Sequence, residues 1–240
     1  DDTLPHKALI QGERVGYLIG ADKADFNGDF WAKENGLDFR IDWLRGQKTG
    51  FFIDQRDNRA LLEQYAKGKE VLNMFCYTGG FSVYALRGGA KLVHSVDVSQ
   101  KAIDLVRSNV AHNFGDYTPH EAFAEEAFEF MGKNQNKYDL IVLDPPAFAK
   151  HRDAVKNALR GYQRLNAKGM QAIRPGGILF TFSCSQAIDK DMFRLAVFSA
   201  AAQVGRKVRI LHQLHQPADH PINIYHPEGE YLKGFVLQVE

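Results

Sequence analysis

Cysteine is scarce in this sequence, and long apolar runs are absent from it. The 240 residues include two cysteines, Cys76 and Cys184, which cannot form the disulfide framework of a small secreted domain. Each thiol is therefore either core packing or a reactive group. No apolar run is long enough to cross a bilayer, and no basic and apolar leader pattern is recognisable. We therefore expect a cytoplasmic protein without a membrane partner.

An excess of charge of one sign is also lacking. Lysine and arginine total 30 and aspartate and glutamate total 29, for a net charge of +1. A balanced total does not exclude a local basic patch. With 45% hydrophobic residues, the chain is long enough for one α/β domain and a small attachment.

A complete set of metal ligands is missing as well. Four histidines crowd the C-terminal part, at His212, His215, His220 and His226. No cysteine or paired acid completes a ligand set with them, so we expect no metal and assign these histidines to loop packing or RNA contact.

The pattern of residues predicts a small N-terminal extension and a larger α/β domain. Asn35-Gly36, the preferred pair of a type I′ turn, precedes alternating apolar residues at Leu37, Phe39 and Ile41. We expect a β-rich extension with a hairpin over 1–53 and a second domain over 54–240.

From residue 70 onward, strands alternate with amphipathic helices, which indicates a mostly parallel seven-stranded sheet with helices on both faces. The last strand follows a loop and should be antiparallel. Expected strands are 70–76, 92–97, 117–121, 138–144, 177–183, 206–212 and 231–239. Expected helices are 54–67, 80–88, 100–113, 124–134, 153–174 and 188–203, the fifth ended by Pro175-Gly176-Gly177.

A nucleotide pocket is predicted at the first two of these strands. The segment 71–82 is a strand, a glycine turn and a helix start, without the three-glycine dinucleotide fingerprint, and Asp97 ends the next strand. Adenosine held without a pyrophosphate clamp favours S-adenosylmethionine over NAD. Glu126 either contacts adenine or stabilises a helix N-terminus. The predicted cofactor residues are Gln55, Arg56, Asn73, Tyr77, Thr78, Gly79, Asp97, Val98, Glu126, Ala127 and Asp144.

Two candidate catalytic groups are predicted at one sheet edge. Leu140 to Leu143 is a short apolar run typical of a buried parallel strand, and Asp144 follows it directly. Cys184, between Ser183 and Ser185, ends a later strand and precedes a helix N-terminus. Cys76 lacks these polar neighbours and is interpreted as packing.

A basic stripe follows Asp144. Arg152, Lys156, Arg160, Arg164 and Lys168 recur every four residues. Such a run is often only a solvated face, but one sign of charge favours a polyanion. The predicted RNA-binding residues are Lys48, Lys150, Arg152, Lys156, Arg160 and Arg164.

Together these residues resemble the bacterial 23S ribosomal RNA large-subunit (cytosine-5) methyltransferase I family. The resemblance covers 31–240 and is carried by the following segments: 48–56 (KTGFFIDQR), 73–80 (NMFCYTGG), 144–148 (DPPAF), 181–185 (TFSCS), 218–221 (ADHP) and 231–235 (YLKGF). It implies a class I methyltransferase with a Rossmann-like fold, S-adenosylmethionine as donor, ribosomal RNA cytosine as acceptor and a covalent adduct at Cys184.

The sequence departs from this family at several points. Members usually begin with a PUA domain, which is missing here, and the chain does not start with Met, so we expect a trimmed protein. Glu126 and Gln186 stand where Asp and a small residue are more usual. The sequence leaves the oligomeric state open, with a homodimer as one alternative.

Two alternatives stay open. A sister family that methylates guanine at nitrogen 7 shares the Lys-Thr-Gly loop and the Asp-Pro-Pro-x-Phe motif but lacks the cysteine. A non-catalytic RNA module that binds S-adenosylmethionine would need neither Asp144 nor Cys184.

Overall fold

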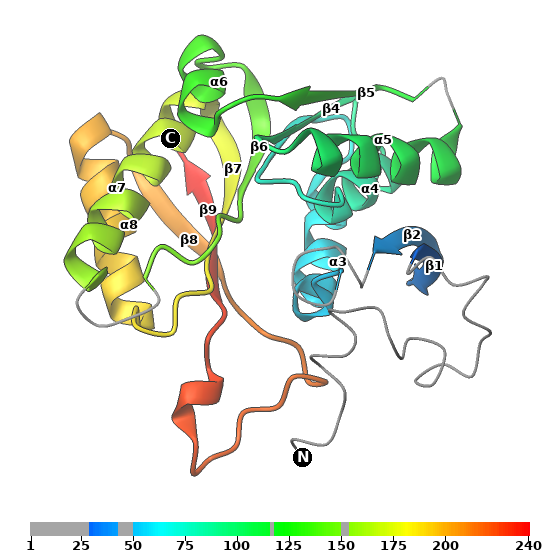
Figure 1. Cartoon of the computed structure of the whole chain (residues 1–240). Coiled ribbons are helices and arrows are strands. Elements are labelled where there is room, and N and C mark those ends of the chain that lie inside the picture. The colour runs from blue at the N-terminus through cyan, green and yellow to red at the C-terminus, as the bar shows by residue number, and fades with distance from the viewer. Residues whose placement is uncertain (1–28, 43–49, 116–117, 150–153) are drawn as a thin grey trace. The chain divides into compact units, whose positions relative to one another are not determined.

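The computed structural model describes residues 29–42, 50–115, 118–149 and 154–240 (Figure 1). The chain separates into two compact units, residues 1–53 and 54–240.

The first unit contains the expected hairpin. Strands β1 (Asp29–Glu34) and β2 (Leu37–Asp42) pair antiparallel. Asn35 (φ 50°) and Gly36 (φ 83°) both have positive φ, as a type I′ turn requires. Phe39 is 1% exposed, and its ring lies 4.8 Å from that of Phe51, centroid to centroid. The alternating pattern is thus confirmed as a half-buried strand.

The second unit is built on a seven-stranded sheet with the strand order β5-β4-β3-β6-β7-β9-β8. Strands β3 to β7 are parallel, whereas β9 pairs antiparallel with both β7 and β8, as expected for a strand that follows a loop. The strands are β3 (Glu70–Met74), β4 (Leu92–Asp97), β5 (His120–Ala124), β6 (Tyr138–Leu143), β7 (Ile173–Ser183), β8 (Val208–His215) and β9 (Lys233–Val239).

Helices cover both faces of this sheet, with α3, α4 and α5 on one side and α6, α7 and α8 on the other (Figure 1). Their bounds are α3 (Arg56–Tyr65), α4 (Gly80–Arg87), α5 (Gln100–Phe114), α6 (Ala127–Lys133), α7 (Val155–Ala172) and α8 (Lys190–Val204), with 3-10 turns η1 (Ile53–Gln55) and η3 (Pro227–Gly229). Two buried cores result. One holds Leu72, Ile141 and Phe193 under α6 to α8, and the other holds Leu62, Val71 and Val142 under α3 and α4.

Several predicted boundaries were wrong. The long helix ends at Ala172 and β7 begins at Ile173, so Pro175 and Gly176 lie within a strand. The pairing of β7 with β6 jumps there from Ile173 to Ile178, because a residue without an N–H interrupts a ladder. Strand β5 starts three residues later than expected, at His120, and α6 starts at Ala127, where Glu126 caps it.

The position of the site follows from the order of the strands. After β5 the chain returns to place β6 beside β3, on the side away from β4. Ligands of open α/β sheets bind outside the carboxyl ends of the strands at such a reversal. The residues that follow Met74 and Leu143 therefore face a common crevice.

A chain of polar side chains crosses the interior behind this crevice. Asn73 donates to Ser82 (2.9 Å), the hydroxyls of Ser82 and Ser95 lie 2.6 Å apart, and Ser95 contacts His120 Nε2 at 2.8 Å. The first three residues are at most 1% exposed. This series of hydrogen-bonded side chains links β3, α4, β4 and β5. Each buried polar group thereby has a partner, as buried polar groups need.

Burial lowers the pKa of His120 from 6.5 to about 4. Above pH 6.5 the ring is neutral in the folded and unfolded states alike. As the pH falls from 6.5 towards 4, the unfolded chain binds a proton that the folded chain does not, so the free energy of unfolding falls by up to about 3 kcal/mol. We expect His120→Gln to remove this part of the pH dependence. Urea unfolding of both proteins from pH 7.5 to 4.5 measures the free energy of unfolding at each pH. If this free energy falls equally with pH in the wild type and in His120→Gln, the prediction is contradicted.

Candidate active site

The turn between β3 and α4 has an unusual backbone. Phe75 (φ 57°), Tyr77 (φ 46°) and Gly79 (φ 78°) all lie in the left-handed region. A Cβ atom at Gly79 would lie 3.0 Å from the Val106 side chain, so backbone and α5 approach closely here. Left-handed non-glycine residues cluster at ligand sites, where the surrounding structure stabilises them. The turn presents backbone at the N-terminus of α4, which favours an anionic or polar ligand.

Asp97, at the end of β4, holds this turn in place. Its carboxylate accepts hydrogen bonds from the backbone N–H of Tyr77 (3.1 Å) and of Ser99 (3.0 Å). Ser99 in turn caps α5 by accepting from the N–H of Ala102. An ionised carboxylate has about four acceptor positions, so two such bonds leave capacity for ligand hydroxyls.

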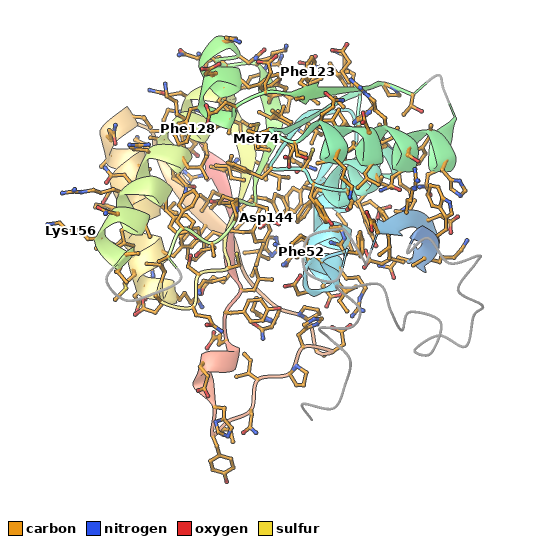
Figure 2. The ribbon with its side chains drawn as sticks, viewed as in Figure 1. Phe52, Met74, Phe123, Phe128, Asp144 and Lys156 are labelled. Atoms are coloured by element: carbon orange, nitrogen blue, oxygen red, sulfur yellow. The ribbon has the colours of Figure 1, made fainter. Side chains whose placement is uncertain are left out.

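Asp144 follows β6, which lies next to β3 in the sheet, and Figure 2 labels it there. The amide of Gln55 donates to Asp144 Oδ2 at 3.0 Å, and Asn58 donates to Gln55 Oε1 at 2.7 Å. Gln55 and Asn58 are buried. The start of α3 therefore fixes the orientation of the acid.

Cys184 lies at the same edge of the sheet. Its Sγ is 3.9 Å from the carbonyl oxygen of Pro145, the residue after Asp144. Cys184 is partly exposed, whereas Cys76 is 6% exposed and burial raises the pKa of its thiol well above the ordinary value. Of the two thiols, Cys184 is thus the accessible one.

The two serines that flank Cys184 are fully buried and do not line a solvated pocket. The hydroxyls of Ser183 and Ser185 each lie 2.9 Å from the phenol oxygen of Tyr162 on α7. Ser185 Oγ also accepts from the N–H of Ala149. The serines therefore fix the backbone around the thiol.

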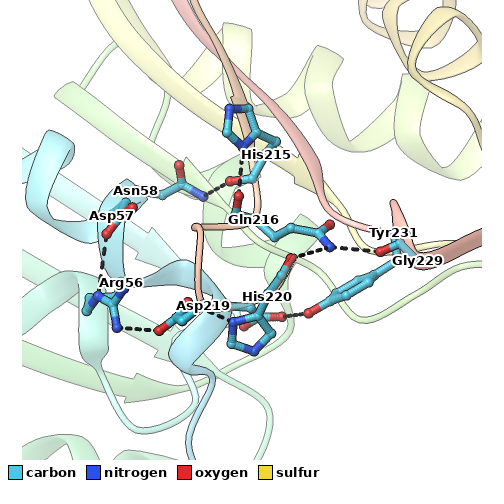
Figure 3. Close-up of polar contacts among 10 residues, drawn as sticks. Arg56, Asp57, Asn58, His215, Gln216, Asp219, His220, Gly229 and Tyr231 are labelled. Carbon is cyan, nitrogen blue, oxygen red and sulfur yellow. Dashed lines mark hydrogen bonds and ion pairs between the residues drawn. The ribbon is translucent and has the colours of Figure 1, made fainter. Parts of the chain in front are cut away.

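Arg56 holds the segment between β8 and β9. Its guanidinium donates to Asp219 at 2.5 Å and also pairs with Asp57 at 3.4 Å (Figure 3). Hydrogen bonds from His220 and Arg56 lower the pKa of Asp219. The predicted cofactor residue Arg56 is thus engaged by the segment that carries the Asp219-His220 pair.

The clustered histidines each have a protein partner. His212 Nε2 lies 2.7 Å from the Tyr65 hydroxyl, and His215 Nδ1 lies 2.7 Å from the Gln216 carbonyl. His220 and His226 pair with neighbouring acids. Among the described residues, no three His, Cys, Asp or Glu side chains are grouped as metal ligands would be.

The remaining predicted cofactor residues have different surroundings. Asn73 and Thr78 are buried, and Val98 is 71% exposed. Glu126 caps α6 by accepting a hydrogen bond from the N–H of Glu129 at 3.0 Å. Of the two roles expected for this acid, the structure thus shows stabilisation of a helix N-terminus. Ala127 is buried in the core under α6.

The basic stripe is present on α7. Lys156, Arg160 and Arg164 are exposed, and Figure 2 shows Lys156 at the outer side of the helix. No acidic residue lies in the sequence of α7. The Arg164 guanidinium lies 5.5 Å from the centroid of the Phe128 ring. Lys48, Lys150 and Arg152 lie outside the described residues.

Sequence reasoning missed the residues that support the site. Tyr231 donates to Asp54 Oδ2 at 2.7 Å, and Lys233 donates to the carbonyl of Ser185 at 2.7 Å. No sequence motif pointed to Asn58 or Tyr162. Tyr231 and Lys233 had one, because both belong to the Tyr-Leu-Lys-Gly-Phe segment.

The strand order, the glycine turn and the acids at the ends of β4 and β6 define the class I methyltransferase fold. Residues 25–226 match the model of the S-adenosylmethionine-dependent methyltransferase family, and the chain belongs to this family. None of the described helices is long and apolar enough to span a membrane.

Curated relatives resemble the chain over most of its length. Ribosomal RNA large subunit methyltransferase I of Tolumonas auensis is 46% identical over 240 residues, which are 99% of this chain and 60% of the relative. The protein of the same name from Pseudoalteromonas translucida is 45% identical over 86% of this chain and 53% of its own length. The chain thus spans slightly more than half the length of these relatives.

Solved structures of methyltransferases have a similar fold. A protein assigned as a methyltransferase and crystallised with SAH has a TM-score of 0.80 at 27% identity, covering 89% of this chain and 57% of its own. A second, assigned as a SAM-dependent methyltransferase from Streptococcus mutans, has a TM-score of 0.79 at 26% identity, covering 89% and 56%.

Proposed function

We propose that this chain is the catalytic part of an enzyme that forms 5-methylcytosine in large-subunit ribosomal RNA, with S-adenosylmethionine as methyl donor. The observation that carries the proposal is the position of Cys184. Its sulfur lies 3.9 Å from the carbonyl of Pro145, next to Asp144, at the carboxyl edge of the sheet. The ribosomal RNA substrate is supported by the names of the curated relatives.

The residues at the ends of β3 and β4 suit the donor. A side chain at Gly79 would fill the space between the turn and Val106, and Asp97 keeps acceptor capacity for ribose hydroxyls. Tyr77, Thr78 and Gly79 would line the donor with backbone. When bound, the donor supplies an electrophilic methyl group.

Cytosine needs activation because its carbon 5 is a poor nucleophile. The proton of Cys184 leaves to solvent, and the thiolate adds to carbon 6, which turns carbon 5 into an enamine carbon. A protonated Asp144 would hydrogen-bond ring nitrogen 3 of a flipped-out base and stabilise the charge that develops there. Carbon 5 would then take the methyl group, with S-adenosylhomocysteine as the leaving group. A base would remove the carbon-5 proton, and the bond between the sulfur and carbon 6 would break to release the thiolate.

Gln55 would support Asp144 in this step. Its amide donates to one carboxyl oxygen, Oδ2, and Asn58 keeps the amide in that orientation. This contact would hold the carboxyl group in one orientation toward the base. Methylation of guanine at nitrogen 7 requires no thiol addition, because that nitrogen is itself nucleophilic, so the accessible cysteine favours cytosine.

Asp97→Ala should weaken the binding of S-adenosylmethionine about 10-fold or more, because a charge-assisted hydrogen bond to ribose is lost. Isothermal calorimetry measures it. Asp104→Ala, which removes an exposed acid from α5, is the control and should bind as the wild type does. Equal affinity of the Asp97 variant and the control would reject the placement.

Arg160→Ala combined with Arg164→Ala should weaken RNA binding and reduce the slope of log affinity against log salt by about 1.4 to 1.8. Binding of the donor should not change. Lys207→Ala combined with Arg209→Ala removes two exposed charges at the start of β8 as a control. A salt slope that stays at the wild-type value would identify the stripe as a solvated face.

Cys184→Ala should bind donor and RNA but transfer no methyl group, whereas Cys76→Ala should remain active. RNA that contains 5-fluorocytosine has no removable proton at carbon 5 and should trap the wild type as a covalent adduct. Mass spectrometry of the trapped protein identifies the modified cysteine. An active Cys184→Ala protein, or an adduct at Cys76, would overturn the mechanism.

A further inference from the structure

We propose that Lys233 is a positioning residue that holds a positive charge beside Cys184 and thereby stabilises its thiolate. The inference rests on the proposed role of Cys184 as nucleophile. It goes further by naming the group that makes this thiol reactive.

Lys233 is tied to the backbone on both sides of the thiol. It lies on β9 directly opposite Ser183 of β7, and it is 6% exposed. Its ammonium donates to the carbonyl of Ser185 at 2.7 Å and to that of Tyr231 at 2.8 Å. Cys184 lies between Ser183 and Ser185, so the ammonium lies alongside the segment that carries the sulfur.

A buried ammonium that donates to two neutral carbonyls is only partly compensated for its lost hydration. Burial lowers the pKa of Lys233, and the negative charges of Cys184, Glu230 and Asp189 oppose this shift, with Cys184 the largest of the three. An ionised Cys184 and the Lys233 ammonium would therefore attract one another.

Among the described residues, the titratable groups near this segment include acids and phenols, which as anions would oppose a thiolate. They come from every element that packs there, namely Asp144 after β6, Tyr162 on α7, Asp189 before α8, Glu230 and Tyr231 before β9, and Asp54 in η1. The Pro145 carbonyl near Sγ likewise favours the protonated thiol. Of the groups named here, all in the part of the chain that the structure describes, Lys233 is the cation.

A cation beside the thiol would favour the addition step. The thiolate, and not the thiol, attacks carbon 6, and neighbouring positive charge is what makes cysteines reactive at neutral pH. The proton of Cys184 leaves to solvent while Lys233 keeps its own. After methyl transfer the same charge stabilises the departing thiolate.

The test is the pH dependence of iodoacetamide alkylation at Cys184, followed by mass spectrometry of its peptide in the absence of RNA and donor. Lys233→Gln keeps an N–H donor for the carbonyls but removes the charge. It should shift the midpoint of alkylation upward by about one pH unit or more, a reaction about 10-fold slower at pH 7. Lys233→Arg should restore the wild-type profile, and Lys190→Gln, at the exposed start of α8, should not change it.

An unchanged profile for Lys233→Gln would overturn the proposal and leave Lys233 a purely structural residue, even if the melting temperature falls. If Lys233→Gln does not fold, the wild type decides, because a midpoint above that of free cysteine, about 8.5, contradicts a stabilised thiolate. Since neither RNA nor donor is present, this experiment tests the effect of Lys233 on the thiol independently of whether the protein methylates cytosine.

Discussion

The parallel register of β3, β6 and β7 is the constraint on which the rest of the structure depends. Met74 pairs with Leu143, and Leu143 pairs with Thr181. Strands β3 and β6 therefore end at one level, and β7 runs two residues further, to Ser183, so the residues that follow the three strands emerge at the same edge of the sheet. A glycine turn, a carboxylate and a thiol come to one edge because backbone hydrogen bonds fix that level, although they are far apart in the sequence.

Long-range polar contacts then decide how these groups are oriented. Asp97 holds the turn, Gln55 holds Asp144, and Tyr162 holds the backbone around Cys184 through its flanking serines. Each supporting residue comes from a different element, and the two contacts of Tyr162 are buried while those of Asp97 and Gln55 are partly buried. Loops that carry chemistry need such support, since a displacement of about 1 Å is enough to reduce catalysis strongly.

The fold could be predicted from local patterns because they are strong here. The apolar run before Asp144 is fully buried as β6, and Asn35-Gly36 forms the expected turn. The residue at which β7 begins was less predictable, since the irregular pairing near Pro175 depends on how β7 pairs with β6. The supporting contacts could not be predicted: Lys233 belongs to a recognisable segment, but its contact with Ser185 arises only through the antiparallel pairing of β9.

The central claim is that this edge methylates carbon 5 of cytosine, and the nature of the methylated nucleoside tests it most directly. Large-subunit ribosomal RNA is incubated with the protein and methyl-labelled S-adenosylmethionine, digested to nucleosides and separated by chromatography with mass detection. The account predicts that the label is in 5-methylcytidine. Label in 7-methylguanosine, or in no nucleoside at all, would contradict it.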